Sequence, residues 1–150
     1  MVASFNGTRF ASFYRRVVAL RCLLVDDSAR FLRAARILLE GEGLQIVGTA
    51  STEAEAVQAV AELRPDVTLV DIDLGQESGF DVVRRLVEDP DLEPGAVILI
   101  SGHAEEDVAD MVQTSSARGF VDKSQLSAAA VRQLLDDSGG AAGTPTPASR

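Results

Sequence analysis

The most constraining feature of this sequence is a short run, Val67–Val70, that follows a proline and ends at the carboxylate of Asp71. A run this short and this apolar predicts a β-strand buried on both faces of a sheet. Loop-forming residues follow between Gly75 and Gly79, and apolar residues then recur at helical spacing from Phe80. Asp71 is therefore expected at the mouth of a strand, just before a loop and a helix.

The same unit of strand and helix recurs along the chain. Further strands are predicted at Cys22–Val25, Leu44–Ala50, Val97–Ile100 and Gly119–Val121. The second of these alternates between apolar and polar residues, as an edge strand does. Five strands that alternate with helices predict an α/β fold, in which a five-stranded parallel sheet carries helices on both faces.

Capping residues predict where the helices begin. Ser28 can cap the first helix, and Thr52 with Glu55 resembles a capping box for the second. Ser127 can cap the last helix. The spacing of apolar residues predicts that the first helix buries Phe31, Leu32, Ala35 and Leu39, and that the second buries Ala54, Val57 and Ala61.

Charge and composition exclude several classes of function. The 150 residues carry a formal net charge of -9, which argues against binding to the phosphate backbone of nucleic acids. The single cysteine, Cys22, and the single histidine, His103, exclude disulfide frameworks and Cys/His zinc sites. No apolar stretch has the length of a membrane span and no secretory cleavage pattern is present, so a cytoplasmic location is expected.

The chain length is that of one domain with less ordered ends. Residues 1–20 lack a sustained period and are expected to form an N-terminal extension. Residues 21–137 are expected to form the folded domain. Residues 138–150 are dominated by Gly, Ala, Pro, Ser and Thr, and a disordered tail is expected there.

Polar side chains follow four of the predicted strands: Asp26 and Asp27, Asp71, Ser101 and Lys123. The carboxyl ends of parallel strands share one edge of a sheet, so these side chains are expected to converge. Clustered carboxylates repel each other unless a cation is present, and an oxygen-only ligand set favours a hard ion such as Mg²⁺. Aspartate can also act as a nucleophile toward a phosphoryl group. Taken singly, each residue could equally be a turn, a cap or a solvated surface group, and it is the joint pattern that favours a site.

Lys123 is the only lysine in a chain that uses arginine at every other basic position. A compact ammonium, and not a planar guanidinium, is therefore expected to be needed at this strand end.

These motifs resemble the receiver domain of bacterial two-component response regulators. The resemblance covers about residues 21–137 and is carried by Leu-Leu-Val-Asp-Asp-Ser, Pro-Asp-Val-Thr-Leu-Val-Asp-Ile-Asp-Leu, Ile-Leu-Ile-Ser-Gly and Gly-Phe-Val-Asp-Lys-Ser. It implies a flavodoxin-like (βα)5 fold and a phosphoprotein of phosphorelay signalling that is not a turnover enzyme.

The resemblance also implies a role for each site residue. Asp71 would accept a phosphoryl group from a sensor histidine kinase or phosphotransfer protein. Asp26, Asp27, the Asp71 carboxylate and the backbone carbonyl of Asp73 would hold Mg²⁺. Ser101 would be the switch hydroxyl, Lys123 the phosphoryl contact and Phe120 the switch aromatic, and the resulting surface change would be read by a downstream protein.

Three positions depart from the family pattern. Asp73 and His103 stand two residues after the acceptor and the switch hydroxyl, and they are expected to tune hydrolysis of the acyl phosphate. Asp122 replaces a frequent proline before the lysine, so a trans peptide bond is expected there.

Two other functions compete with this interpretation. The Asp71-Ile-Asp73 motif looks like the nucleophile motif of haloacid-dehalogenase-type phosphatases, but in that family the acidic pair comes last in the chain and here Asp26-Asp27 comes first. A receiver that is never phosphorylated and serves only for docking is the other alternative. No output domain is expected after the tail, which favours a single-domain regulator without direct nucleic acid or membrane binding.

Overall fold

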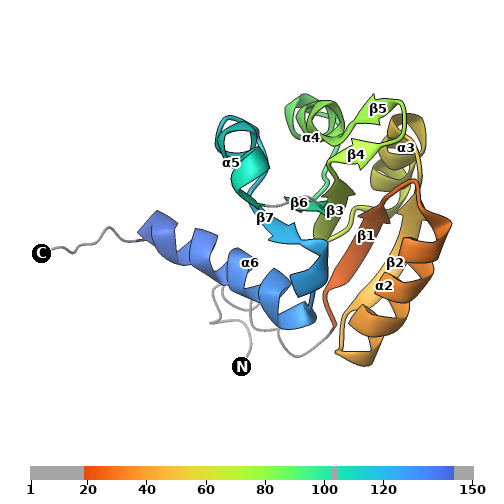
Figure 1. The fold of residues 1–150 in the computed structure, drawn as a ribbon, viewed down its shortest axis with the longest axis horizontal. Coiled ribbons are helices and arrows are strands. Elements are labelled where there is room, and N and C mark those ends of the chain that lie inside the picture. Colours follow the sequence, from red (N-terminus) through yellow and green to blue (C-terminus); the bar gives the residue numbers. More distant parts are fainter. Residues whose placement is uncertain (1–18, 103–104, 144–150) are drawn as a thin grey trace, which may run out of the picture.

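The computed structural model describes residues 19–102 and 105–143. Five parallel strands form the central sheet in the order β2-β1-β3-β6-β7 (Figure 1). The strands are β1 (Arg21–Val25), β2 (Gln45–Ala50), β3 (Val67–Asp71), β6 (Ala96–Ser101) and β7 (Gly119–Asp122). The predicted five-stranded parallel sheet is confirmed, with the expected edge strand β2 at one side.

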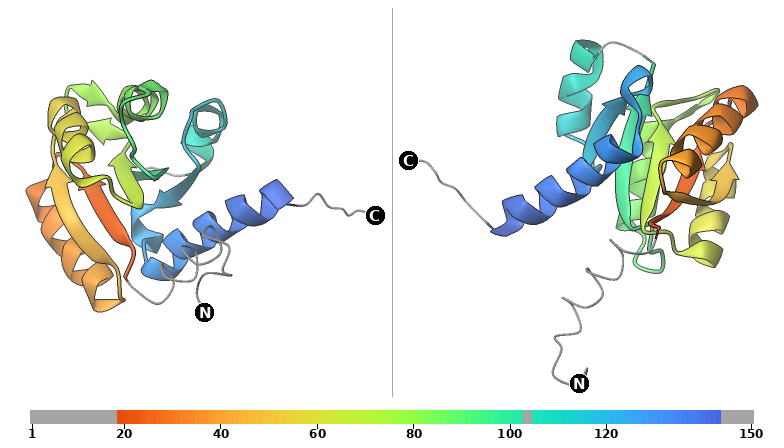
Figure 2. Two further views of the ribbon diagram at one scale, coloured as in Figure 1. Left: turned by 180° about the vertical axis from the view of Figure 1, so that it is seen from behind. Right: turned by 90° about the horizontal axis from the view of Figure 1, so that it is seen from below.

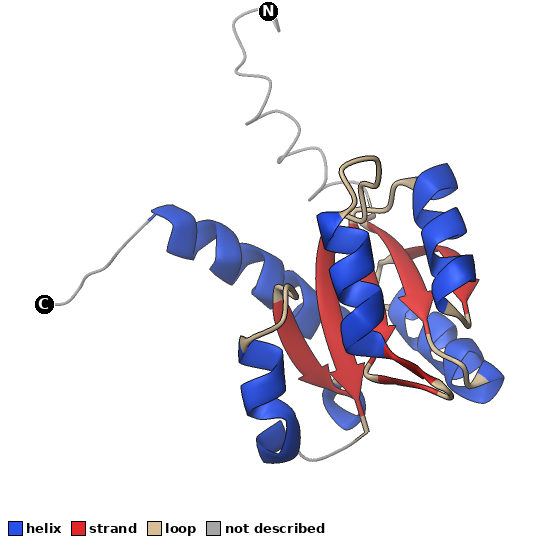
Figure 3. Cartoon of the chain, turned by 90° about the horizontal axis from the view of Figure 1, so that it is seen from above, coloured by secondary structure: helices blue, strands red, loops and turns tan. Residues whose placement is uncertain are grey.

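Helices cover both faces of the sheet (Figures 2 and 3). The helices are α2 (Ala29–Gly41), α3 (Glu53–Leu63), α4 (Gly79–Glu88), α5 (Glu105–Gln113) and α6 (Ala128–Gly143), with a 3-10 turn at Lys123–Gln125. Apolar residues of α2 and α6 pack with Leu24 and Ile98 on one face, while those of α3, α4 and α5 pack with Leu23 and Leu99 on the other. Adjacent strand residues therefore supply two separate cores, as strands buried on both faces must.

The predicted caps form. The Ser28 hydroxyl accepts a hydrogen bond from the Phe31 N–H at 3.1 Å, and the Thr52 hydroxyl accepts one from Glu55 at 3.1 Å. The Glu55 carboxylate accepts the N–H of Ser51 in return. These bonds satisfy N–H groups that have no partner within the helix.

The predicted buried face of α3 is wrong. Ala56 and Val60 are buried, whereas Ala54 and Ala61 are exposed and Val57 is partly buried. Alanine and valine occupy most positions of this helix, so its apolar periodicity is weak, and packing against the sheet selects the face.

The domain extends slightly past its expected ends. Leu20 packs into the core that α2 and α6 share, although it was expected in the extension. Helix α6 continues to Gly143, so residues 138–143 are helical where a disordered tail was expected. This segment contains three glycines and two alanines, and the helix continues into it from the preceding turns of α6 because adding residues to an existing helix is easier than starting a new one. None of the helices in the described part of the chain has the length and apolar character of a membrane span.

Candidate functional site

The carboxyl ends of the parallel strands meet at one edge of the sheet, and the polar residues predicted for the site lie there. Asp26 and Asp27 directly follow β1, and Asp71 is the last residue of β3. Ser101 is the last residue of β6, and Lys123 directly follows β7. In the ladders Asp71 is paired with Ile100, and Ser101 with Asp122, so the ends of these strands are level.

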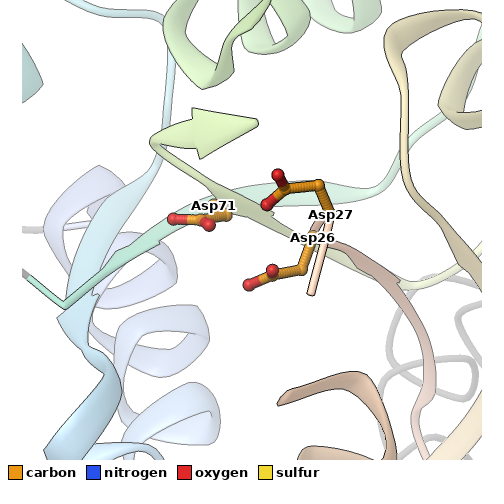
Figure 4. Close-up of side chains that lie close together, drawn as sticks. All are labelled: Asp26, Asp27 and Asp71. Carbon is orange, nitrogen blue, oxygen red and sulfur yellow. The ribbon is translucent and has the colours of Figure 1, made fainter. Parts of the chain in front are cut away.

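Three carboxylates form the centre of the site. Asp26, Asp27 and Asp71 each offer an oxygen atom, and these atoms lie within 4.8 Å of one another (Figure 4). Asp26 and Asp71 are buried, whereas Asp27 is exposed. Two of the three carboxylates are therefore shielded from water, and the third is open to solvent.

Lys123 joins two of these carboxylates. Its Nζ atom lies 2.7 Å from Asp26 Oδ2 and 3.3 Å from Asp71 Oδ2. Burial acts to lower the pKa of Lys123, but the hydrogen bonds and negative charges of Asp26 and Asp71 outweigh it, and the net direction is upward. The ammonium therefore stays charged and compensates part of the carboxylate charge.

The acceptor candidate is electrostatically unusual. Burial, with the charge of Asp26 as a second cause, raises the pKa of Asp71 from 3.8 to about 6. Lys123 and the Asp73 N–H act in the opposite direction. The carboxylate is still mostly ionised at neutral pH, in a setting that favours a further positive charge.

Local backbone contacts fix the two buried acids. The Asp26 Oδ1 atom accepts the Ser28 N–H at 2.8 Å, and Asp71 Oδ1 accepts the Asp73 N–H at 3.2 Å. A short antiparallel hairpin follows Asp71, formed by β4 (Asp73–Leu74) and β5 (Glu77–Ser78). Gly75 turns this hairpin with a φ of +66°, in the left-handed region that favours glycine, and passes close to the Asp27 carboxylate.

The other residues predicted for the site, Ser101, Phe120, Asp73 and His103, differ in their burial and in how far the structure describes them. Ser101 is fully buried at the end of β6. Phe120 is partly buried and packs against the core on the α5 side of the sheet. The Asp73 side chain is exposed, and His103 lies outside the described residues. No cis peptide bond occurs in the described residues, in agreement with the trans bond expected at Asp122.

One aromatic contact was not anticipated from the sequence. The Phe31 ring lies under Lys123, with the Nζ atom 4.2 Å from the ring centroid. Phe31 was expected only as a core residue of the first helix. The sequence does place Phe31 in the first turn of the helix that follows Asp26-Asp27, close to the predicted site. It gives no sign of the contact itself, because Lys123 lies far along the chain.

Known proteins resemble this chain in sequence and in fold. The sequence profile described as the response regulator receiver domain matches residues 22–136. Protein-glutamate methylesterase/protein-glutamine glutaminase 4 of Geobacter metallireducens is 35% identical over 104 residues, which cover 65% of this chain and 28% of that protein. Transcriptional regulatory protein BtsR of Salmonella typhi is 40% identical over 81 residues, which cover 53% of this chain and 33% of that protein. This chain therefore spans only about a third, or less, of these two relatives.

A solved structure agrees with the sequence relatives. The signal receiver domain of the putative response regulator NarL from Mycobacterium tuberculosis superposes with a TM-score of 0.69 at 27% identity, over 82% of this chain and 98% of that one. The profile match spans nearly all of the folded domain. The chain belongs to the response regulator receiver domain family of two-component systems.

Proposed function

We propose that Asp71 accepts a phosphoryl group from a sensor histidine kinase or a phosphotransfer protein in a Mg²⁺-dependent reaction. The observation that carries this proposal is the cluster at the sheet edge, where the carboxylates of Asp26, Asp27 and Asp71 lie together and the ammonium of Lys123 contacts Asp26 and Asp71. In the reaction a carboxylate oxygen of Asp71 bonds to phosphorus while the phosphorus–nitrogen bond of the donor phosphohistidine breaks. The imidazole leaves with the electron pair of that bond.

The donor set fits Mg²⁺. Three carboxylates offer oxygen atoms within 4.8 Å of one another, and no softer ligand lies among them. Asp26, Asp27 and Asp71 would hold the ion, together with the backbone carbonyl of Asp73. When bound, Mg²⁺ neutralises carboxylate and phosphoryl charge.

The other residues of the site have roles in the same proposal. Lys123 presents a charged ammonium beside the Asp71 carboxylate and pairs with a phosphoryl oxygen after transfer. Ser101 supplies a hydroxyl to another phosphoryl oxygen. Phe120 packs against the core on the α5 side of the sheet, and in this proposal a shift of Ser101 is passed through Phe120 to the surface formed by α5, β7 and α6.

The proposal concerns the receiver unit. That it works as a single-domain regulator through a downstream protein target, without direct nucleic acid binding, stays a prediction from the sequence. The negative net charge of -9 supports contacts with proteins over contacts with a nucleic acid backbone.

Intact mass after incubation with phosphoramidate, with and without Mg²⁺, tests the proposal. We expect a Mg²⁺-dependent gain of one phosphoryl group in the wild type and in Asp81→Asn, but not in Asp71→Asn. Asp81 is a suitable control because it is an exposed aspartate paired with Arg84, outside the cluster. If no adduct forms and no phosphate is released, the docking module is the better interpretation; steady release of phosphate without Asp71 dependence would also contradict the proposal.

A further inference from the structure

The ammonium of Lys123 has three neighbours in the described part of the chain. Asp26 Oδ2 lies at 2.7 Å, Asp71 Oδ2 lies at 3.3 Å, and the centroid of the Phe31 ring lies at 4.2 Å. The Lys123 side chain is 24% exposed, so solvent reaches only part of it. The ring therefore takes the place of part of the hydration shell that a lysine normally keeps.

One short segment supplies both the strongest ionic partner and the ring. Asp26 is held through its Oδ1 atom by the Ser28 N–H, and the Ser28 hydroxyl caps α2 by accepting the Phe31 N–H. The cap thus fixes Phe31 in the first turn of α2, where its ring also packs partly against the core beneath α2 and α6. The carboxylate and the ring therefore reach the ammonium from one short segment, the end of β1 and the first turn of α2.

Lysine reaches its site on a flexible four-carbon stem, unlike the planar fork of arginine. Two carboxylate contacts alone leave the ammonium free to move around the carboxylate oxygens on this stem. A ring face that is anchored to the core restricts the space in which Nζ can move, and its negative quadrupole attracts the cation.

We propose that Phe31 is a positioning residue that holds the Lys123 ammonium at the phosphoryl site before the phosphoryl group arrives. This inference rests on the proposed function of Asp71 and Lys123. Preorganised charge is more effective in group transfer than charge that must first be moved into place. Loss of the ring should therefore slow transfer without removing any carboxylate.

The single lysine of the chain allows a direct structural test. Uniform lysine labelling with carbon-13 gives one set of side-chain signals, all from Lys123. Protons held above a ring face are shielded, so the Lys123 Hε signals of the wild type and of Phe31→Tyr should lie upfield of those of Phe31→Leu. Identical Hε shifts in the wild type and Phe31→Leu would refute the ring contact.

The functional test compares rates of phosphorylation by phosphoramidate at saturating Mg²⁺. Phe31→Leu should slow the reaction by about fivefold to thirtyfold, the range expected from the strength of a partly desolvated cation–π contact. Phe31→Tyr keeps an aromatic ring at this position and should react at the wild-type rate. Leu39→Val loosens the packing of the same helix at its far end, since Leu39 is fully buried in the last turn of α2, and it should leave the rate within twofold of the wild type.

Each result has a distinct meaning. A normal rate in Phe31→Leu, or an equal loss in Leu39→Val, would overturn the positioning role. If the wild type itself gains no phosphoryl group, the proposed function of Asp71 fails, and the Lys123 Hε signals still decide whether the ring holds the ammonium.

Discussion

Gly79 is the first residue of α4, and replacing it with alanine should damage both the fold and the site. A Cβ atom at this position would lie 2.0 Å from the Asp71 backbone oxygen and 2.7 Å from the Ile72 Cα. Both neighbours are backbone atoms at the strand end that carries the proposed acceptor, so they cannot move aside by rotating a side chain. The Gly79 N–H also donates to the Ile72 carbonyl at 2.7 Å, which fixes the close approach.

The magnitude follows from two opposed effects. Alanine favours helix over glycine by about 1 kcal/mol. Overpacking in a well-packed region costs about 1 to 3 kcal/mol, and a contact short by about 1 Å against backbone belongs at the upper end. The free energy of unfolding should therefore fall by roughly 1 to 2 kcal/mol in Gly79→Ala after the helix gain is included.

Gly41→Ala is the matched control. Gly41 ends α2, and a Cβ atom there would meet nothing within 4 Å. Its free energy of unfolding should stay unchanged or rise by up to about 1 kcal/mol.

Urea unfolding followed by circular dichroism measures both variants, and phosphorylation by phosphoramidate measures the site. Gly79→Ala should be slower to accept the phosphoryl group because its Asp71 backbone is displaced. A Gly79→Ala protein as stable and as reactive as Gly41→Ala would refute the reasoning.

Three further predictions concern single side chains. Burial raises the pKa of the Cys22 thiol from 9.0 to about 12, so the thiol of the unfolded chain loses its proton first as pH rises. The free energy of unfolding measured in urea should therefore be highest below pH 9 and decline between pH 9 and about 12. A Cys22→Ala protein should lack this decline, and an equal decline in both proteins would contradict the assignment. Lys123→Arg should leave the circular dichroism spectrum intact but slow phosphorylation, because a planar guanidinium cannot take the position of the ammonium between Asp26 and Asp71. A normal rate of phosphorylation would count against the need for a compact charge. Asp73→Asn or His103→Ala should change the lifetime of the phosphorylated protein, followed by intact mass after removal of the donor, and unchanged lifetimes in both variants would dismiss the tuning role.

The strand ends could be predicted from the sequence because each short apolar run stops directly at a polar residue. Val67–Val70 before Asp71 and Ala96–Ile100 before Ser101 are buried throughout. Once the strands are parallel, geometry alone brings their carboxyl ends to one edge. The convergence of Asp26, Asp27, Asp71 and Lys123 follows from this rule.

Features that depend on tertiary packing could not be predicted in the same way. The buried face of α3 is ambiguous in a helix rich in alanine, and only contact with the sheet selects Ala56 and Val60. The β4–β5 hairpin has strands of two residues each, which is too short for a period of two to be visible. The contact between Phe31 and Lys123 joins distant parts of the chain, and periodicity assigns Phe31 only to a helix face.

The central claim is that the phosphoryl group is attached to Asp71, and locating it tests this claim most directly. Borohydride reduces an acyl phosphate to a primary alcohol, so fragmentation of the peptides in a mass spectrometer after phosphorylation and reduction identifies the modified residue, and it separates Asp71 from Asp73 in the same peptide. We predict that the peptide containing residue 71, and no other acidic peptide, becomes lighter than its unmodified form, and only when Mg²⁺ was present. Reduction at another aspartate or glutamate, with Asp71 unchanged, would contradict the account.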